Sequence, residues 1–165
     1  MNPVPLFLII VTLPLLLGGC GEKDTITTKP ELEIRKGVRC LKGSDTPYTG
    51  TAITYMNGQK KREVNYSEGV EDGLHTVWYE NGERRQELTI KNGKPEGLQL
   101  GWHVNGQKKY EGEFKEGKQD GLYVEWYENG QKKQESMFKG DKKIYIKVWN
   151  SKGEPVDSFR EANKE

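Results

Sequence analysis

The sequence contains too few aliphatic residues for a thick hydrophobic core. Only 33% of its 165 residues are hydrophobic, and many of the Val, Leu and Ile residues fall within the first 17 positions. One domain is the natural expectation at this length, but the composition excludes a deep, multilayered core. Aromatic residues, which make up 10% of the chain, must therefore supply much of the buried surface.

The sequence also lacks an excess of charge of either sign. Lys and Arg number 26 and Asp and Glu number 25, and the two signs are interleaved along the chain. Nucleic acids and anionic lipid surfaces attract a basic patch, which this distribution does not indicate. We therefore expect no nucleic-acid partner.

Cysteine and histidine are too rare to indicate a catalytic or metal centre. The chain has two Cys and two His residues, and His75 and His103 have no partners at ligand spacing. Cys40 is left without an internal disulfide partner if Cys20 is modified, so we expect a semi-buried structural thiol. Intermolecular pairing and a reactive thiol are the alternatives for Cys40. The sequence predicts no metal, no cofactor and no enzymatic activity.

One long hydrophobic run is present, at the N-terminus. Residues 4–17 are almost entirely apolar, but the run is shorter than the roughly 20 residues of a transmembrane helix. A short apolar region followed by small residues predicts a signal peptide over residues 1–19. The sequence Leu17-Gly18-Gly19-Cys20 resembles the bacterial lipobox, which implies that Cys20 is lipidated and becomes the mature N-terminus. An uncleaved anchor is the alternative.

This resemblance implies a location and a domain organisation. It places the protein in the bacterial cell envelope, anchored to a membrane by lipid, and Gly21 after the Cys permits outer-membrane sorting in a Gram-negative cell. The remaining chain divides into four expected parts. They are residues 20–30 (lipidated Cys and polar tether), 31–50 (capping segment), 51–148 (repeat array) and 149–165 (degraded repeat, cap and tail).

A repeat of 24 residues dominates the chain. Asn-Gly occurs four times at this spacing, at Asn57-Gly58, Asn81-Gly82, Asn105-Gly106 and Asn129-Gly130. Basic, acidic and aromatic positions recur with it: Lys61, Arg85, Lys109 and Lys133; Glu63, Glu87, Glu111 and Glu135; Trp78, Trp102 and Trp126; Tyr66, Ile90, Phe114 and Phe138. A fixed period of this length indicates a repeat architecture.

Turn signals predict that each copy is a β-hairpin. Asn-Gly between β-prone runs favours a type I′ turn, in which both central residues have positive φ. A second turn falls between the Asn-Gly turns, at Glu68-Gly69, Asn92-Gly93 and Glu116-Gly117. The fold predicted is all-β: an antiparallel meander of hairpin repeats that forms an elongated, single-layer twisted sheet.

Alternation within the strands predicts two different faces. Leu122, Val124 and Trp126 point one way, and Tyr110, Gly112 and Phe114 share a face on the return strand. We expect one aromatic and aliphatic face with a structural ladder of Trp78, Trp102, Trp126, Tyr66, Phe114 and Phe138. The opposite face is expected to be charged, with the repeated Glu residues in cross-strand ion pairs. Tyr79, Tyr123 and Tyr127 are expected to be exposed.

At the level of motifs, the chain resembles a known family. Residues 127–133 read Tyr-Glu-Asn-Gly-Gln-Lys-Lys, and residues 114–122 read Phe-Lys-Glu-Gly-Lys-Gln-Asp-Gly-Leu. With the entry sequence over residues 43–50, these resemble the MORN-repeat variant of the bacterial YwqK family of proposed antitoxins. The resemblance covers about residues 40–145 and implies a repeat fold and a protein partner, such as a toxin.

The sequence therefore predicts a non-catalytic, lipid-anchored protein-binding module of antitoxin or immunity type. The alternative is an envelope-associated structural or adhesive module that binds lipid headgroups, glycan or peptidoglycan. The partner's identity, the binding face and the oligomeric state stay open.

Overall fold

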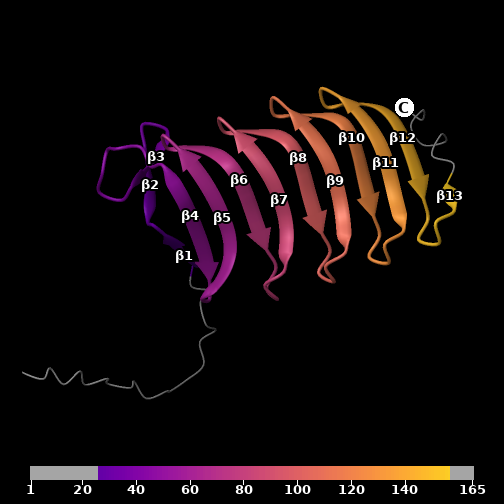
Figure 1. Cartoon of the computed structure of the whole chain (residues 1–165), viewed down its shortest axis with the longest axis horizontal. Helices are drawn as coiled ribbons and strands as arrows, with labels where there is room; N and C mark the ends of the chain where they lie inside the picture. Colours follow the sequence, from indigo (N-terminus) through magenta and orange to yellow (C-terminus); the bar gives the residue numbers. More distant parts are fainter. Residues whose placement is uncertain (1–25, 157–165) are drawn as a thin grey trace, which may run out of the picture.

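The computed structural model describes residues 26–156, and these residues form an all-β molecule. Eleven strands form one sheet in the order β1-β4-β5-β6-β7-β8-β9-β10-β11-β12-β13, and β2 and β3 form a separate hairpin. Figure 1 shows the long sheet as a row of hairpins along the molecule. The predicted antiparallel meander is confirmed.

From β4 onward, short turns join the strands, so neighbours in sequence are neighbours in the sheet, whereas β1 and β4 are separated in sequence by the β2–β3 hairpin. The bounds in the long sheet are β1 (Ile26–Lys29), β4 (Gly50–Met56), β5 (Gln59–Ser67), β6 (Val70–Trp78), β7 (Arg84–Lys91), β8 (Lys94–Trp102), β9 (Lys108–Lys115), β10 (Lys118–Trp126), β11 (Lys132–Lys139), β12 (Lys142–Trp149) and β13 (Pro155–Val156). The separate hairpin consists of β2 (Leu32–Arg35) and β3 (Val38–Leu41).

The end of the predicted polar tether belongs to the sheet. β1 pairs with β4 in an antiparallel register, and the hydroxyl groups of Thr28 and Thr54 lie 3.2 Å apart. The interpretation of residues 26–29 as tether was wrong, because β-branched Thr side chains favour the extended backbone that an edge strand needs.

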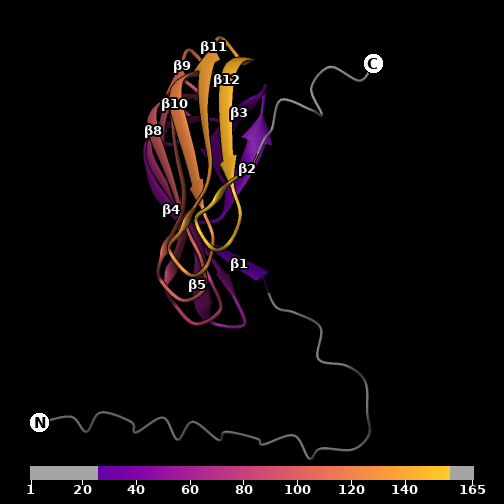
Figure 2. The same ribbon diagram turned by 90° about the vertical axis from the view of Figure 1, so that its right-hand side faces the viewer.

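The β2–β3 hairpin covers one face of the sheet at its N-terminal end (Figure 2). Leu32 and Tyr48 pack against a buried cluster of Ala52, Val64 and Tyr66. Cys40 on β3 is only 1% exposed, so it is fully buried rather than semi-buried. The hairpin therefore covers a small buried hydrophobic cluster at this end of the described residues.

The four Asn-Gly turns do not share one geometry. Asn57 and Gly58 both have positive φ, of 52° and 77°, as a two-residue type I′ turn requires. At the other three turns only the glycine has positive φ. There the backbone N–H of Gly82 donates to Tyr79 O at 3.2 Å and that of Tyr79 to Glu83 O at 2.8 Å. This is a three-residue loop of a type I turn followed by a left-handed glycine.

The type I′ geometry recurs instead at the turns on the opposite side of the sheet. Both central residues have positive φ at Glu68-Gly69, Asn92-Gly93, Glu116-Gly117 and Gly140-Asp141. We call this row of turns the carboxylate rim, and we call the row at Asn57, Asn81, Asn105 and Asn129 the asparagine rim.

The cross-strand register corrects the predicted faces. Val124 lies opposite Glu111 and Glu135, whereas Tyr123 lies opposite Gly112 and Ser136. Residues directly opposite one another in an antiparallel pair share a face. The Trp and Phe/Tyr positions are therefore on opposite faces, and the prediction of one aromatic face and one charged face is wrong.

Each face thus mixes apolar and charged residues. The tryptophan face carries Trp78, Trp102, Trp126, Trp149, Leu100, Val124 and the repeated Glu residues. The hairpin face, which β2–β3 covers at one end, carries Val64, Tyr66, Val77, Tyr110, Phe114, Tyr123, Glu125 and Phe138.

Candidate binding surface

Asparagine side chains connect each copy of the repeat to the next along the asparagine rim. Within its own turn, Asn105 Oδ1 accepts a hydrogen bond from the backbone N–H of Gln107 at 3.1 Å. Its Nδ2 donates to the Glu128 carbonyl of the following copy at 2.9 Å. Asn81 and Asn129 repeat both bonds with their own neighbours. Asn81, Asn105 and Asn129, predicted as turn formers, therefore also join copies.

A second position on this rim forms the same kind of connection. The hydroxyl of Tyr79 donates to Trp102 O at 2.6 Å, and the hydroxyl of Tyr127 donates to Trp149 O at 3.0 Å. His103 occupies the equivalent place, with Nε2 at 2.9 Å from Trp126 O. Tyr79 and Tyr127 are half-buried rather than exposed, because each is held against the next copy.

The carboxylate rim uses acidic side chains for the same purpose. Asp72 Oδ2 accepts the backbone N–H of Asn92 at 2.9 Å, and Glu96 Oε2 accepts that of Glu116 at 2.7 Å. Asp120 does the same for Gly140 at 3.2 Å. Each acid thus binds the turn of the following copy, so the copies are connected at both rims.

On the tryptophan face, each copy has a basic residue paired with the repeated Glu. Lys108 Nζ lies 2.6 Å from Glu111 Oε2, and the same i, i+3 pair forms at Lys60–Glu63, Arg84–Glu87 and Lys132–Glu135. The predicted cross-strand pairing was wrong, because the partner is on the same strand. Lys108 also lies over the Trp126 ring, 5.3 Å from its centroid, and Lys60 and Lys132 lie similarly over Trp78 and Trp149.

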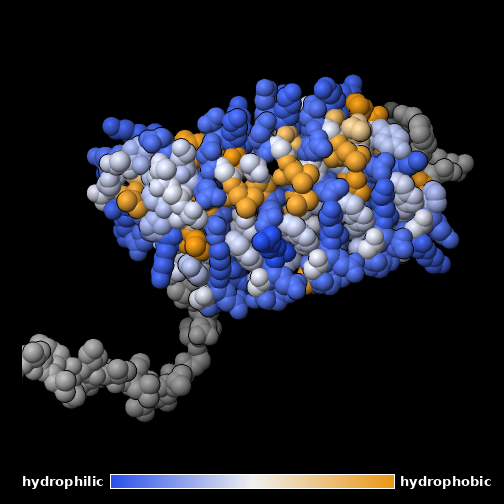
Figure 3. Space-filling view, viewed as in Figure 1, coloured by the Kyte–Doolittle hydropathy of each residue, from blue (hydrophilic) through white to orange (hydrophobic). Residues whose placement is uncertain are grey.

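The tryptophan face also carries an exposed apolar row. Figure 3 shows hydrophobic surface gathered along the middle of this face, between columns of hydrophilic side chains. The row consists of Leu74, Leu98, Leu122 and Met137, all of them exposed.

Tyrosine rings pack over glycines on the hairpin face. Tyr123 lies 6.3 Å from Tyr110 in a stacked arrangement and 6.2 Å from Phe138 edge to face, between ring centroids. A Cβ atom at Gly112 would meet Tyr123 Cδ2 at 2.9 Å, so the ring needs a glycine there. Burial, with a smaller contribution from the Glu125 carboxylate, raises the pKa of Tyr123 to about 12. Tyr123 is therefore half-buried, not exposed as predicted.

The repeated basic position lies at a β-bulge in every copy. Trp78 pairs with Arg84 and Val77 pairs with Gln86, which leaves Arg85 as the inserted residue. The same shift places Lys61, Lys109 and Lys133 at bulges. A bulge re-aims a side chain, and Lys133 Nζ accordingly lies 2.7 Å from Glu125 Oε1 on the hairpin face.

A hollow of about 670 Å³ opens beside the first two of these basic residues. Three basic residues, Lys61, Arg62 and Arg85, line it with Glu80 and Asn81, and its apolar lining consists of Met56, Val77, Trp78, Tyr79 and Val104.

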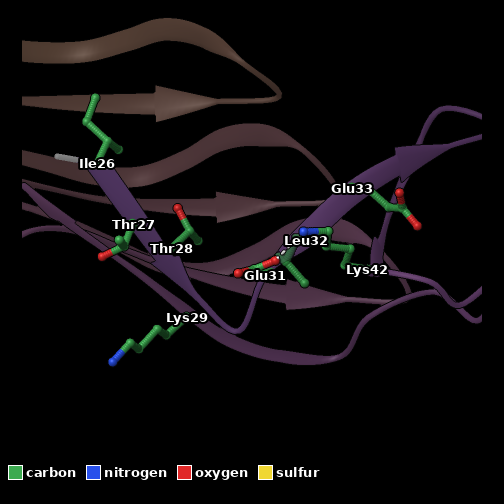
Figure 4. A pocket seen from close by; sticks show the side chains of 8 residues that line it. All are labelled: Ile26, Thr27, Thr28, Lys29, Glu31, Leu32, Glu33 and Lys42. Atoms are coloured by element: carbon green, nitrogen blue, oxygen red, sulfur yellow. Dashed lines mark hydrogen bonds and ion pairs between the residues drawn. The ribbon is translucent and has the colours of Figure 1, made fainter. Parts of the chain in front are cut away.

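A second hollow, of about 490 Å³, lies between β1 and the β2–β3 hairpin (Figure 4). Its charged side chains do not converge: Lys29 and Glu33 point to different sides, and Lys42 is paired with Glu31 at 2.7 Å. That hydrogen bond lowers the pKa of Glu31. These charged groups therefore do not point towards a common position that a ligand could occupy.

The remaining titratable candidates have structural partners. His75 Nε2 accepts a hydrogen bond from Arg62 Nε at 2.8 Å, and burial lowers the pKa of His75. Between residues 26 and 156, no group of three or more His, Cys, Asp or Glu side chains could hold a metal ion. The same part of the chain has no helix that is long and apolar enough to cross a membrane. Cys20 and the signal peptide lie outside the described residues.

Two sets of residues had no predicted role although they connect the copies. Asp72, Glu96 and Asp120 recur at 24 residues, and Tyr79, His103 and Tyr127 do so as well. Their recurrence at 24 residues is the sequence pattern by which they could have been identified. Their bonds could not be anticipated, because they depend on how closely adjacent hairpins are stacked.

Comparison with known proteins agrees with this architecture. Residues 71–92 and 119–139 match the family model described as MORN repeat variant, and each match spans a hairpin through an asparagine turn. No curated protein matches the chain.

Among solved structures, one similar chain comes from the crystal structure of the GtfA/B complex bound to UDP and GlcNAc, at 8% identity and a TM-score of 0.30. The match covers 67% of this chain and 22% of that chain, and it carries no functional argument. The two segment matches and the regular sheet together identify the chain as a β-hairpin repeat protein similar to the MORN repeat variant.

Proposed function

We propose that this chain is a non-catalytic, lipid-anchored module that binds another protein. The observation that carries the proposal is the bonding between copies at both rims of the sheet, where Asn105 and Glu96 are examples. Side chains that hold adjacent hairpins together pre-organise an extended surface, and a pre-organised surface loses less conformational entropy on binding. The similarity to the MORN repeat variant supports a repeat-based binding module.

Lysine side chains lie over three of the tryptophan rings, and this favours a protein partner over a glycan. A sugar would stack on an open aromatic face, but Lys60, Lys108 and Lys132 each lie over a Trp ring. Those amino groups are also paired with carboxylates, so a stacking ligand would have to displace them. The alternative envelope role, binding glycan or peptidoglycan, is correspondingly weaker.

The engagement of the repeated carboxylates supports a role without catalysis. Glu87, the least exposed of the four, pairs with Arg84 at 2.9 Å, and the other three have the same basic neighbour. An acid or base catalyst must contact the proton that it transfers, and a carboxylate already paired with a basic residue of its own strand is less accessible to a substrate.

Lipid anchoring at Cys20 rests on the lipobox-like sequence. More than one acyl chain is needed for stable membrane attachment. Cys20→Ser should therefore move the protein from the membrane fraction to the soluble fraction. Unchanged membrane retention of that variant would contradict the anchor.

Chemical cross-linking of the full chain in its native membrane tests the binding function. We expect one protein to be recovered reproducibly and to bind the purified chain directly. An antitoxin or immunity role further predicts that the chain relieves the toxicity of that partner when both are expressed. Recovery of no protein, with retention of the chain by peptidoglycan, would replace this proposal with the envelope alternative.

A further inference from the structure

The basic residue at the bulge forms a close ion pair, at 2.7 Å, in only one of the described copies. Lys133 pairs with Glu125, but the equivalent positions in the three earlier copies are Gly101, Val77 and Ile53. Lys109, Arg85 and Lys61 therefore lack the acidic neighbour that Lys133 has. We call these three residues the basic row.

The basic row has little compensation elsewhere. Over residues 26–156, Arg85 and Lys109 are exposed and form no ion pair within 4.0 Å. Lys61 is less free: its Nζ lies 4.0 Å from Glu80 Oε1 and donates to Gln59 Oε1 at 3.5 Å, and its side chain is 18% exposed. Positive and negative charges are interleaved in the sequence, but positive charge is in local excess along the basic row.

The hollow beside Lys61 and Arg85 adds an apolar component to this site. Val77 lies on β6, the strand between those that carry the two cations, and forms part of its wall; Trp78 also lines it. A ligand that fills it must offer apolar groups close to its negative charges. Simple inorganic anions do not meet this requirement, whereas acidic polypeptides do.

The spacing of the basic row selects an extended ligand. Its members occupy β5, β7 and β9, and alternate strands lie about 10 Å apart. An extended polyproline II segment has three residues per turn and rises about 3.1 Å per residue, so every third side chain falls on one side at about 9 Å. In a β-strand, residues three apart point to opposite sides.

We propose that the basic row binds an extended acidic segment of the protein partner, with a carboxylate at every third residue and apolar residues between. The inference rests on the proposed binding function and names the chemistry of its partner. The hollow takes the apolar side chains, and the three cations pair with successive carboxylates.

A labelled peptide of three Glu-Pro-Pro units tests this proposal by fluorescence anisotropy with the full chain. We expect saturable binding that weakens with salt, and none for the matching Gln-Pro-Pro peptide. Arg85→Gln with Lys109→Gln should weaken binding about threefold to tenfold, given the usual strength of exposed ion pairs. No binding of the acidic peptide to the unmodified chain would overturn the proposal.

Lys91→Gln with Lys115→Gln is the matched control. Those residues are also exposed and repeat at 24 residues, but they end β7 and β9 at the carboxylate rim. The control removes the same two charges and should change affinity less than about twofold. Equal losses in the two double variants would show general charge attraction, as for a membrane surface, and would overturn the proposal.

Glu125→Gln is expected to increase affinity for the acidic peptide, and misfolding could not cause such an increase. The change frees Lys133 from its ion pair and extends the basic row to four members. It should raise affinity for a peptide of four Glu-Pro-Pro units about threefold; unchanged affinity would count against the row. A cross-linked partner that binds the Arg85→Gln/Lys109→Gln variant undiminished would refute this inference alone and leave the proposed function standing.

Discussion

Single side chains at the asparagine rim each serve two copies of the repeat. Asn105 closes its own turn through Gln107 and binds the Glu128 carbonyl of the next copy. The turn bond is local, whereas the second bond exists only when adjacent hairpins are stacked. The residue therefore contributes both to forming a hairpin and to joining hairpins.

Asn105→Ala removes both bonds and should lower the free energy of unfolding by roughly 1–2 kcal/mol, at about 1 kcal/mol for each hydrogen bond. Urea denaturation measures the change. Asn105→Asp separates the two roles, because its carboxylate keeps the turn acceptor but cannot donate to Glu128. An Asp variant as stable as the unmodified protein would show that the bond between copies contributes nothing.

The Tyr123 hydroxyl predicts a loss of stability at alkaline pH. Its pKa is about 12 in the fold, against an ordinary value of 10.0. An acid whose pKa is raised by folding contributes stability that is complete below about pH 10 and disappears as the pH rises towards 12. Urea unfolding at pH 9 and at pH 11.5 should show a larger loss for the unmodified protein than for Tyr123→Phe. Equal losses would mean that this phenol is not shielded.

At the scale of strands and turns, a glycine opposite a tyrosine leaves room for the tyrosine ring to pack against the paired strand. A Cβ atom at Gly101 would clash with Tyr110 Cε1, although Gly101 itself has no positive φ. The restriction at this position is therefore purely steric. Strands β8 and β9 depend on it, since Gly101 and Tyr110 are directly paired.

Gly101→Ala should destabilise the protein by about 1–3 kcal/mol, the usual cost of overpacking. Tyr110→Ala in the same chain should recover part of that loss, because it removes the atom that clashes. Thermal or urea unfolding of both single variants and the double variant measures the coupling. Strictly additive effects would contradict the proposed contact.

Sequence reasoning succeeded where the cause is local and failed where it depends on register. The recurrence of Asn-Gly gave the hairpins, and alternation gave the correct direction of Val124 and Tyr123 within their strand. The bulges then decided which residues lie opposite, and a one-residue shift moves a side chain to the other face. For this reason the Trp and Phe/Tyr positions were wrongly placed together.

The geometry of the Asn-Gly turns also depends on strand pairing that the local sequence does not reveal. Asn57-Gly58 forms the predicted type I′ turn because β4 remains paired as far as Met56, with Ile26 of β1 on its other side. At Asn81, Asn105 and Asn129 the preceding strand ends earlier, and a longer loop forms from the same dipeptide. The basic row was hidden for a related reason, since only the fold shows which carboxylates reach the repeated cations.

At the scale of the whole molecule, the sheet is one continuous surface. Each copy binds the next through side chains at the asparagine rim and at the carboxylate rim, and through the backbone ladder between strands. Stability in such an array comes mainly from contacts between neighbours. A partner would therefore meet a surface that behaves as a unit and not as four separate hairpins.

Native-state hydrogen exchange of the β5–β11 amides tests this central claim most directly. If the copies are held together at both rims, the amides should open with one common free energy, and Asn105→Ala should lower it for strands on both sides of the substitution. Separate opening energies for each hairpin, with the effect of Asn105→Ala confined to β8 and β9, would contradict the claim.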